Sequence, residues 1–218
     1  MTGRKLLAEF LGALLLTACV IGSGIMAERL AAGNAAVALL ANTFATVAVL
    51  ATLIAQFGPI SGAHFNPVVT AAALHLQQLN LRLALLYVVA QIVGCCAGAI
   101  LANAMFELPL VSASVHTRSG AAQWLSEVVA TAGLIFIALR APSFRDAAWR
   151  VPLWIGAAYW FTASTSFANP AITIGRAMSD TFAGIRPADV PGFIAAQLMG
   201  AAAGVLMLRI FAAPREAA

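Results

Sequence analysis

Two short stretches decide how this chain folds: Ser61-Gly62-Ala63-His64-Phe65-Asn66-Pro67-Val68-Val69-Thr70 and Asn169-Pro170-Ala171, whose Asn-Pro pairs lie 103 residues apart. Each Asn-Pro pair predicts the start of a short helix, because a Pro in the first turn loses no hydrogen bond that the helix could use. Asn is a favoured helix N-cap, and its side-chain amide also carries two donors. A single Asn-Pro usually marks only a turn. Two of them in apolar surroundings are a stronger signal.

The composition around these motifs is that of a membrane protein. Of the 218 residues 62% are hydrophobic and 9% are charged, against roughly 25% charged residues in soluble domains. With three cysteines and no charge-rich or Gly-X-Y tract, a disulfide scaffold, a disordered chain and collagen are also excluded. The net charge of +4 comes from basic residues spread thinly between apolar stretches. This pattern favours membrane topology over nucleic-acid binding, so no nucleic-acid partner is expected.

Runs of about 20 uncharged residues predict six membrane-spanning helices. The expected spans are about 6–27, 35–57, 83–105, 122–139, 151–165 and 190–209. Breaks at Gly58-Pro59, Asn66-Pro67 and Asn169-Pro170 follow from the poor fit of Pro within a helix. They leave two short helices, at about 67–76 and 170–181. Helices of about ten residues cannot cross a ~30 Å hydrocarbon core, so these two must be re-entrant.

The two halves of the chain are similar to each other. Glu9 matches Glu127, each near the start of a span, and the Asn-Pro pairs match in order. Gln91, Gly94 and Gly98 recur 106 residues later as Gln197, Gly200 and Gly204. Each half holds three spans, an odd number, so the halves are inverted relative to each other. We expect one domain over residues 1–218, with inverted repeats at about 6–105 and 122–209.

The basic residues predict the orientation in the membrane. With the N-terminus in the cytoplasm, the inner side would hold Arg4, Lys5, Arg82, Arg140, Arg145, Arg150, Arg209 and Arg215, and the outer side Arg29, Arg118, Arg176 and Arg186. This distribution favours cytoplasmic N- and C-termini. No cleavable signal peptide is evident in the first span. Eleven Arg to one Lys, with abundant Ala, indicates a bacterial protein of the inner membrane.

At its paired motifs the chain resembles the aquaporin, or major intrinsic protein, family. The resemblance runs from Glu9 to Gly204 with every element in order. It implies six helices plus two half-helices, a homotetramer with one pore in each subunit, and no cofactor. It also implies that Glu9 and Glu127 hold the re-entrant loops. The expected function is a passive channel for water and small neutral solutes, with Asn66 and Asn169 facing the pore centre.

The chain departs from the family pattern in two places, within the first motif and directly after the second. The first reads Asn66-Pro67-Val68 instead of Asn-Pro-Ala. After Asn169-Pro170-Ala171, where most members have the Arg of the selectivity filter, this chain has Ile172. Counting back from the two Asn residues without gaps gives Thr46, Ala157 and Ser166 as the other filter positions. Such a filter would be wide and weakly polar, and would suit glycerol, urea or neutral metalloid hydroxides. The missing Arg removes one barrier to cations, but the dipoles of the two Asn-Pro helix ends remain, so we expect no ion conduction.

Two residues allow more than one interpretation. Arg176 lies four residues beyond Ile172 on the same helical face, so its guanidinium could reach back to the filter. Alternatively, Arg176 pairs with Asp180 and fixes the loop that follows. His64 precedes the first Asn-Pro pair, where it could gate the pore with pH or simply pack in the loop.

Other functional classes are less favoured by the sequence. The main alternative is an inverted-repeat secondary transporter, but the only carboxylates well inside spans are Glu9 and Glu127. Their matching positions suit a scaffolding role better than a proton path. No nucleophile and base at catalytic spacing indicate an enzyme. Three isolated His residues and cysteines within spans predict no metal site.

Overall fold

A computed structural model describes residues 2–211 of the chain, which form six long helices, two short ones and a single 3₁₀ turn. Arg215, one of the basic residues used to predict the orientation in the membrane, lies outside the described residues. The elements are α1 (Thr2–Leu30), α2 (Ala35–Ser61), α3 (Pro67–His75), α4 (Leu81–Met105), α5 (Ala121–Arg140), α6 (Phe144–Phe161), α7 (Pro170–Arg176), η1 (Pro187–Asp189) and α8 (Val190–Ile210). The fold is the all-helical arrangement with two half-helices that the sequence predicts.

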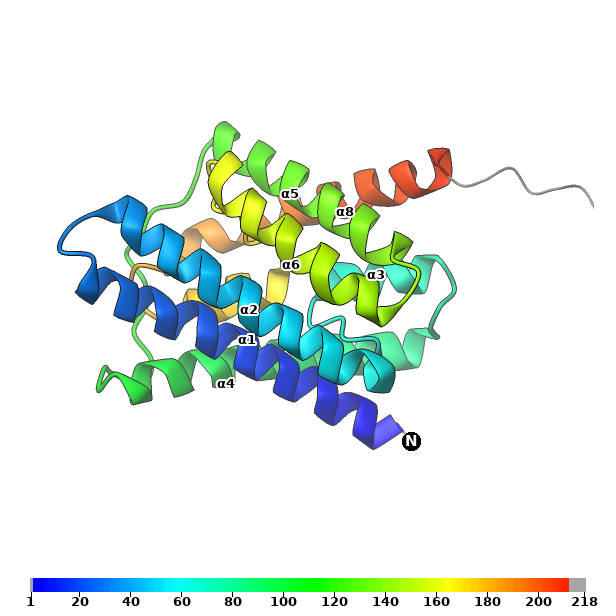
Figure 1. The fold of residues 1–218 in the computed structure, drawn as a ribbon, viewed down its shortest axis with the longest axis horizontal. Coiled ribbons are helices and arrows are strands. Elements are labelled where there is room, and N and C mark those ends of the chain that lie inside the picture. The colour runs from blue at the N-terminus through cyan, green and yellow to red at the C-terminus, as the bar shows by residue number, and fades with distance from the viewer. Residues whose placement is uncertain (1, 212–218) are drawn as a thin grey trace, which may run out of the picture.

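The long helices run side by side and alternate in direction along the bundle (Figure 1). We call the end at which α1 begins the near end, and the opposite end, where α1 finishes at Leu30, the far end. Helix α8 finishes at the near end, on the right of Figure 1, close to the level of the N-terminus. The chain therefore crosses the bundle an even number of times, as six spans require.

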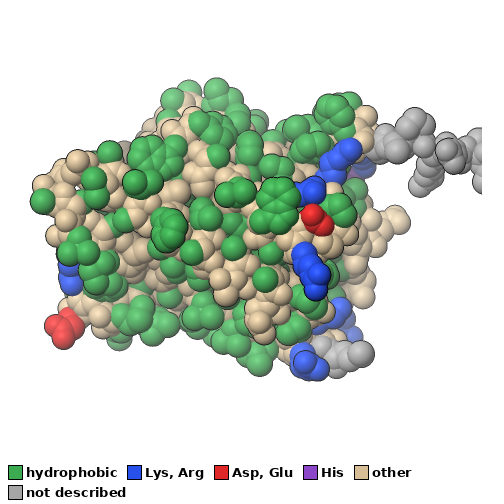
Figure 2. All heavy atoms as spheres, viewed as in Figure 1, with side chains coloured by type: hydrophobic (Ala, Val, Ile, Leu, Met, Phe, Trp, Pro, Cys, Tyr) green, Lys and Arg blue, Asp and Glu red, His purple; other side chains and the backbone are tan. Residues whose placement is uncertain are grey.

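Five of the described helices are long and apolar enough to cross a membrane: α1, α2, α4, α5 and the segment that contains α8. Helix α6 is the sixth long helix, but its first two turns carry Arg145, Asp146 and Arg150. On the face drawn in Figure 2, charged side chains gather toward the two ends, and the middle is covered by apolar and uncharged atoms. This is the surface expected of a protein whose middle lies in lipid.

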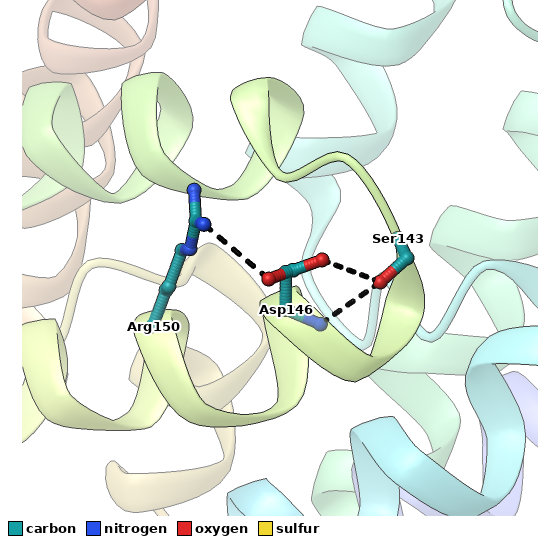
Figure 3. A network of polar contacts seen from close by, with 3 residues as sticks. All are labelled: Ser143, Asp146 and Arg150. Carbon is teal, nitrogen blue, oxygen red and sulfur yellow. Dashed lines mark hydrogen bonds and ion pairs between the residues drawn. The ribbon is translucent and has the colours of Figure 1, made fainter.

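The start of α6 differs from the prediction. The helix covers Phe144–Phe161, whereas the sequence predicted a span over 151–165. Ser143 is its N-cap and accepts a hydrogen bond from the backbone N–H of Asp146 at 3.1 Å. The Asp146 carboxylate accepts from the Ser143 hydroxyl and forms an ion pair with Arg150 at 3.3 Å (Figure 3). Because the sequence prediction relied on uncharged runs, it missed the first two turns of α6, which carry these charged residues.

The predicted break at Gly58-Pro59 is also wrong, because α2 continues through Pro59 to Ser61. Pro removes only one backbone donor, and tertiary packing can outweigh that loss. The helix ends instead at Gly62, whose φ of 95° is left-handed. The two short helices do begin at the predicted prolines, Pro67 and Pro170. Helix α7 ends at Arg176, however, instead of near residue 181.

Glycines bring the long helices into contact in the same way in both repeats. Helix α4 packs on α1, and a Cβ on Gly94 would lie 2.5 Å from the carbonyl oxygen of Phe10. Helix α8 packs on α5, and a Cβ on Gly200 would lie 2.6 Å from the carbonyl oxygen of Val128. Phe10 and Val128 follow Glu9 and Glu127 directly. The glycines therefore fix the helices that hold each carboxylate.

Candidate functional site

The carboxylate of Glu9 anchors the loop between α2 and α3. It is fully buried and accepts four hydrogen bonds. Its Oε1 accepts from the Ser61 hydroxyl at 2.6 Å and from the His64 backbone N–H at 3.0 Å. Its Oε2 accepts from the Phe65 backbone N–H at 2.7 Å and from the Gln91 amide at 2.8 Å. A buried carboxylate is tolerated only when donors surround it in this way.

Glu127 makes the matching set of contacts in the second repeat. Its Oε1 accepts from the Ser164 hydroxyl at 2.6 Å and from the Phe167 backbone N–H at 2.9 Å. Its Oε2 accepts from the Ala168 backbone N–H at 2.8 Å and from the Gln197 amide at 2.7 Å. Each loop partner lies 103 residues after its counterpart in the first repeat. The loops that lead into the two half-helices are therefore held by the same set of hydrogen bonds to a buried carboxylate.

The anchored loops hold a strained backbone. Ala63 and Phe65 have φ values of 50° and 49°, and their counterparts Ser166 and Ala168 have 52° and 47°. Side chains with a Cβ rarely adopt this left-handed conformation, which costs roughly 1–3 kcal/mol per residue. The hydrogen bonds to the two carboxylates offset that cost. The resulting backbone turns Asn66 and Asn169 inward.

The two Asn-Pro motifs meet through the side chains of their Asn residues, each of which reaches the backbone of the opposite loop. Each Asn caps its half-helix: Asn66 accepts from the Val68 N–H, and Asn169 accepts from the Ala171 N–H, both at 3.0 Å. Each also donates one amide hydrogen to the opposite loop. The Asn66 amide reaches the carbonyl of Ala168, and the Asn169 amide reaches that of Phe65, both at 2.8 Å. One amide hydrogen of each Asn is then free of these bonds.

A cavity of about 920 Å³ runs along the bundle past both motifs. At the near end it is lined by residues that include Lys5, Gln78 and Asn80, and it reaches the surface there. It passes Asn66 and Asn169 and continues to Arg176. Within residues 2–211, no side chain of the far-end loops at 31–34 and 177–187 lines it. The cavity therefore ends in the second half of the bundle, close to Arg176.

Three of the four predicted filter residues line this cavity. Thr46, Ser166 and Ile172 are buried and lie along its wall, whereas Ala157 is exposed on the opposite side of α6. Ala157 therefore does not line the cavity in the described structure, and the cavity-lining face of α6 leads instead to Tyr159. The Tyr159 hydroxyl lies 3.4 Å from the hydroxyl of Thr46.

The other motif residues lie in the packed core. Val68 and Ala171 are fully buried and do not line the cavity within the described part of the chain. The two extra methyl groups of Val68 are thus accommodated by packing. His64 lines the cavity, with its Nδ1 3.0 Å from the Thr70 hydroxyl and its ring edge-on to Tyr87. It is held by packing and also faces the cavity, so both of its proposed roles remain predictions.

Arg176 does not form the predicted ion pair with Asp180. Among the described residues the Asp180 carboxylate instead accepts from the Val115 backbone N–H at 3.0 Å. The Nε of Arg176 donates to the carbonyl of Ala183, and its guanidinium carbon lies 3.4 Å from the centre of the Phe167 ring. Arg176 is 3% exposed and lines the end of the cavity. It thus fixes a loop and faces the cavity at once.

Arg118 is a neighbour that the sequence did not single out. It lies in the segment between α4 and α5, and its guanidinium stacks on the same Phe167 ring at 5.1 Å. Its side chain donates to the carbonyls of Gly184 at 2.8 Å and Phe182 at 3.4 Å. Burial lowers the pKa of Arg118, because desolvation disfavours the cation. A single Arg in a polar connecting segment forms no sequence pattern that would predict its contacts with Phe167 and with the loop at Gly184.

Within residues 2–211, no group of three or more His, Cys, Asp or Glu side chains lies close enough together to hold a metal ion. His75 lies at the end of α3 and contacts Arg209 of α8, and the three cysteines are free thiols. The polar side chains along the cavity carry amides and hydroxyls, together with the ammonium of Lys5, the imidazole of His64 and the guanidinium of Arg176. Such groups bind solutes by hydrogen bonding.

The chain is similar to known proteins over most of its length. The profile of the family described as "Major intrinsic protein" matches residues 1–168. The chain is 50% identical over 208 residues to aquaglyceroporin AqpS of Rhizobium meliloti, covering 94% of this chain and 89% of the relative. It is 38% identical to human aquaporin-1 over 105 residues, 47% of this chain and 37% of that protein.

Among solved structures, the aquaglyceroporin from Plasmodium falciparum superposes with a TM-score of 0.71. The match covers 97% of this chain and 96% of that one at 18% sequence identity, so it supports the fold alone. The profile match spans more than half of the chain and includes both carboxylates and the first Asn-Pro motif, and the bacterial relative matches 94% of the chain. The chain belongs to the major intrinsic protein family.

Proposed function

We propose that this protein is a channel in which small neutral solutes pass the two Asn-Pro motifs in single file. Family membership supports the coarser statement that it is a passive membrane channel for water and small solutes, and not an enzyme. The observation that carries the proposal is the cavity of about 920 Å³ that passes both Asn66 and Asn169. In this proposal that cavity is the solute path.

The centre of the path would select for neutral hydrogen-bonding solutes. Asn66 and Asn169 each keep one amide hydrogen that is not bonded to the opposite loop, so a solute oxygen can accept from both. The half-helices point their positive N-terminal ends at the same level, which raises the energy of a cation there. Water, glycerol, urea and neutral metalloid hydroxides all carry suitable acceptors.

The filter of this channel would lie where the cavity ends. We assign it to Thr46, Tyr159, Ser166 and Ile172, with Tyr159 in place of Ala157. It offers hydroxyl groups on one side and an apolar wall at Ile172. A solute such as glycerol, with hydroxyls along one edge and carbon on the other, matches that pattern. The bacterial relative is named an aquaglyceroporin, which supports glycerol as a solute.

We also propose the orientation of the channel in the membrane, the membrane in which it lies and its assembly. The near end, with both termini of the described chain, would face the cytoplasm, because it carries most of the basic residues. The protein would lie in the inner membrane of a bacterium. Its long helices expose apolar side chains such as Leu40, Phe44 and Leu86. These would face lipid or neighbouring subunits of a homotetramer.

Stopped-flow light scattering on proteoliposomes tests the function. Vesicles would shrink quickly under an impermeant osmolyte if water passes, and would swell again quickly under glycerol if glycerol passes. Shrinkage without swelling would limit the channel to water. An uptake rate that saturates and depends on a proton or sodium gradient would favour the secondary transporter instead. Vesicles without protein give the lipid background for both phases.

A further inference from the structure

Arg176 is a buried cation without a carboxylate partner. In the described part of the chain its side chain makes one hydrogen bond, from Nε to the carbonyl of Ala183. Its two terminal nitrogens are left without a protein acceptor at the closed end of the cavity. Buried charges are normally paired, since an unpaired ion in a low-dielectric environment is costly. The terminal nitrogens of this guanidinium can therefore donate to a bound acceptor that is not part of the described chain.

Glu127 forms no direct ion pair with Arg176, and its charge acts on Arg176 only from a distance. Its two oxygens accept four hydrogen bonds from the re-entrant loop and from Gln197. Arg118 stacks on Phe167 as Arg176 does, so a second positive charge lies against the same ring. Two guanidinium groups therefore lie near this end of the cavity, and neither forms an ion pair with a carboxylate in the described structure.

A second polar group at this end also lacks a partner. Ser166 is 2% exposed and lines the cavity, and its Oγ has no hydrogen-bond partner among the described residues. Its counterpart in the first repeat, 103 residues earlier, is Ala63, which carries no hydroxyl. The hydroxyls of Thr46 and Tyr159 line the same wall. A guanidinium with free donors that lines the same cavity as these hydroxyl groups is a chemical match for an oxyanion.

We propose that the far end of the cavity is a binding site for a small carboxylate anion, with Arg176 as its charged ligand and Ser166 as a neutral donor. A planar carboxylate accepts two parallel hydrogen bonds from a guanidinium, a geometry that a spherical halide cannot reproduce. The proposal rests on the proposed function only in that the cavity is the solute path. An anion bound there stands in the way of a neutral solute.

Formate is a suitable probe, because it is the smallest carboxylate. Binding of sodium formate to the purified full-length protein in detergent would be measured by saturation-transfer NMR, with ionic strength kept constant by sodium chloride. We expect Arg176→Gln to weaken formate binding by about tenfold or more, because the charged bidentate contact is lost. Ser166→Ala weakens it less. Equal formate binding in the wild type and Arg176→Gln would overturn the proposal.

Arg29→Gln is a matched control. Arg29 also lies over a phenylalanine, Phe106, and donates to a backbone carbonyl, but it does not line the cavity in the described structure. Its loss should leave formate binding unchanged. A loss equal to that of Arg176→Gln would mean that formate responds only to overall charge, and would overturn the site.

A flux measurement keeps the proposal testable if Arg176→Gln fails to fold. In wild-type proteoliposomes, formate should lower glycerol permeability, whereas the same concentration of chloride should not. Equal effects of formate and chloride would overturn the proposal. If the vesicles do not pass glycerol at all, the proposed function fails, while the NMR measurement still decides whether the carboxylate site exists.

Discussion

The side-chain amide of Asn66 lies 2.8 Å from the carbonyl oxygen of Ala168, the residue just before Asn169. The contact is reciprocal, because the amide of Asn169 reaches the carbonyl of Phe65, just before Asn66, at the same distance. Each half-helix is therefore tied to the loop that leads into the other one. Those loops are in turn held by Glu9 and Glu127, so a defect in either carboxylate should affect both halves of the pore.

Glu9→Gln and Glu127→Gln should each destabilise the protein strongly. An amide presents its own donors to the four donors that now surround the carboxylate, and each donor left unpaired costs about 1–3 kcal/mol. The two variants should lose a similar amount, since the two networks match. The melting temperature and the yield of monodisperse protein in detergent would measure the effect.

Glu28→Gln is the control for that prediction. Glu28 lies on the same helix as Glu9 but is exposed near its far end. Its replacement should change the melting temperature little. Wild-type stability in Glu9→Gln or Glu127→Gln would contradict the anchoring role.

Gly200→Ala should separate α8 from α5. The added Cβ would lie 2.6 Å from the carbonyl oxygen of Val128, and backbone cannot move aside as a flexible side chain can. We expect a loss of about 1–3 kcal/mol in the free energy of unfolding. Gly3→Ala is the control, because a Cβ there meets no atom within 4 Å. Thermal unfolding in detergent of both variants would compare them, and equal melting temperatures would contradict the packing argument.

Ile172→Arg restores the residue that most family members have after the second motif. Ile172 is 7% exposed and lines the cavity beside Arg176, so the new side chain would enter the solute path. Glycerol permeability should fall severalfold, while water permeability should fall less. Ile172→Val keeps the apolar wall and serves as the control in the same stopped-flow measurement. Unchanged glycerol permeability in Ile172→Arg would remove Ile172 from the filter.

The paired motifs were enough to predict the fold, because they repeat at fixed spacing. Pro67 and Pro170 begin the half-helices, and each carboxylate meets the glutamine of its own repeat. These features depend on local residue chemistry and on symmetry, both of which can be seen in a sequence.

Two of the remaining differences arose where distant packing decides the outcome, whereas the start of α6 is set by its local Ser143 cap, which a search for uncharged runs does not use. Pro59 stays within α2 because packing outweighs the lost backbone donor. The contacts of Arg118 join segments more than 60 residues apart. No local pattern encodes such contacts, so they could not be read from the sequence.

The assignment of the filter residue on α6 can be tested by two substitutions on opposite sides of that helix. Tyr159 is 4% exposed and lines the cavity, whereas Ala157 is exposed on the outer surface. Tyr159→Ala should widen the end of the path and raise the ratio of glycerol to water permeability severalfold. Ala157→Leu adds apolar volume on the outside and should leave that ratio unchanged.

Both ratios would be measured in proteoliposomes that contain equal amounts of protein. The hydroxyl of Tyr159 also approaches Thr46, so Tyr159→Phe separates the contribution of the ring from that of the hydroxyl. It keeps the ring and removes only the hydroxyl. If the ring sets the width, Tyr159→Phe should keep the wild-type ratio while Tyr159→Ala does not. A ratio that changes in Ala157→Leu but not in Tyr159→Ala would return the filter position to Ala157.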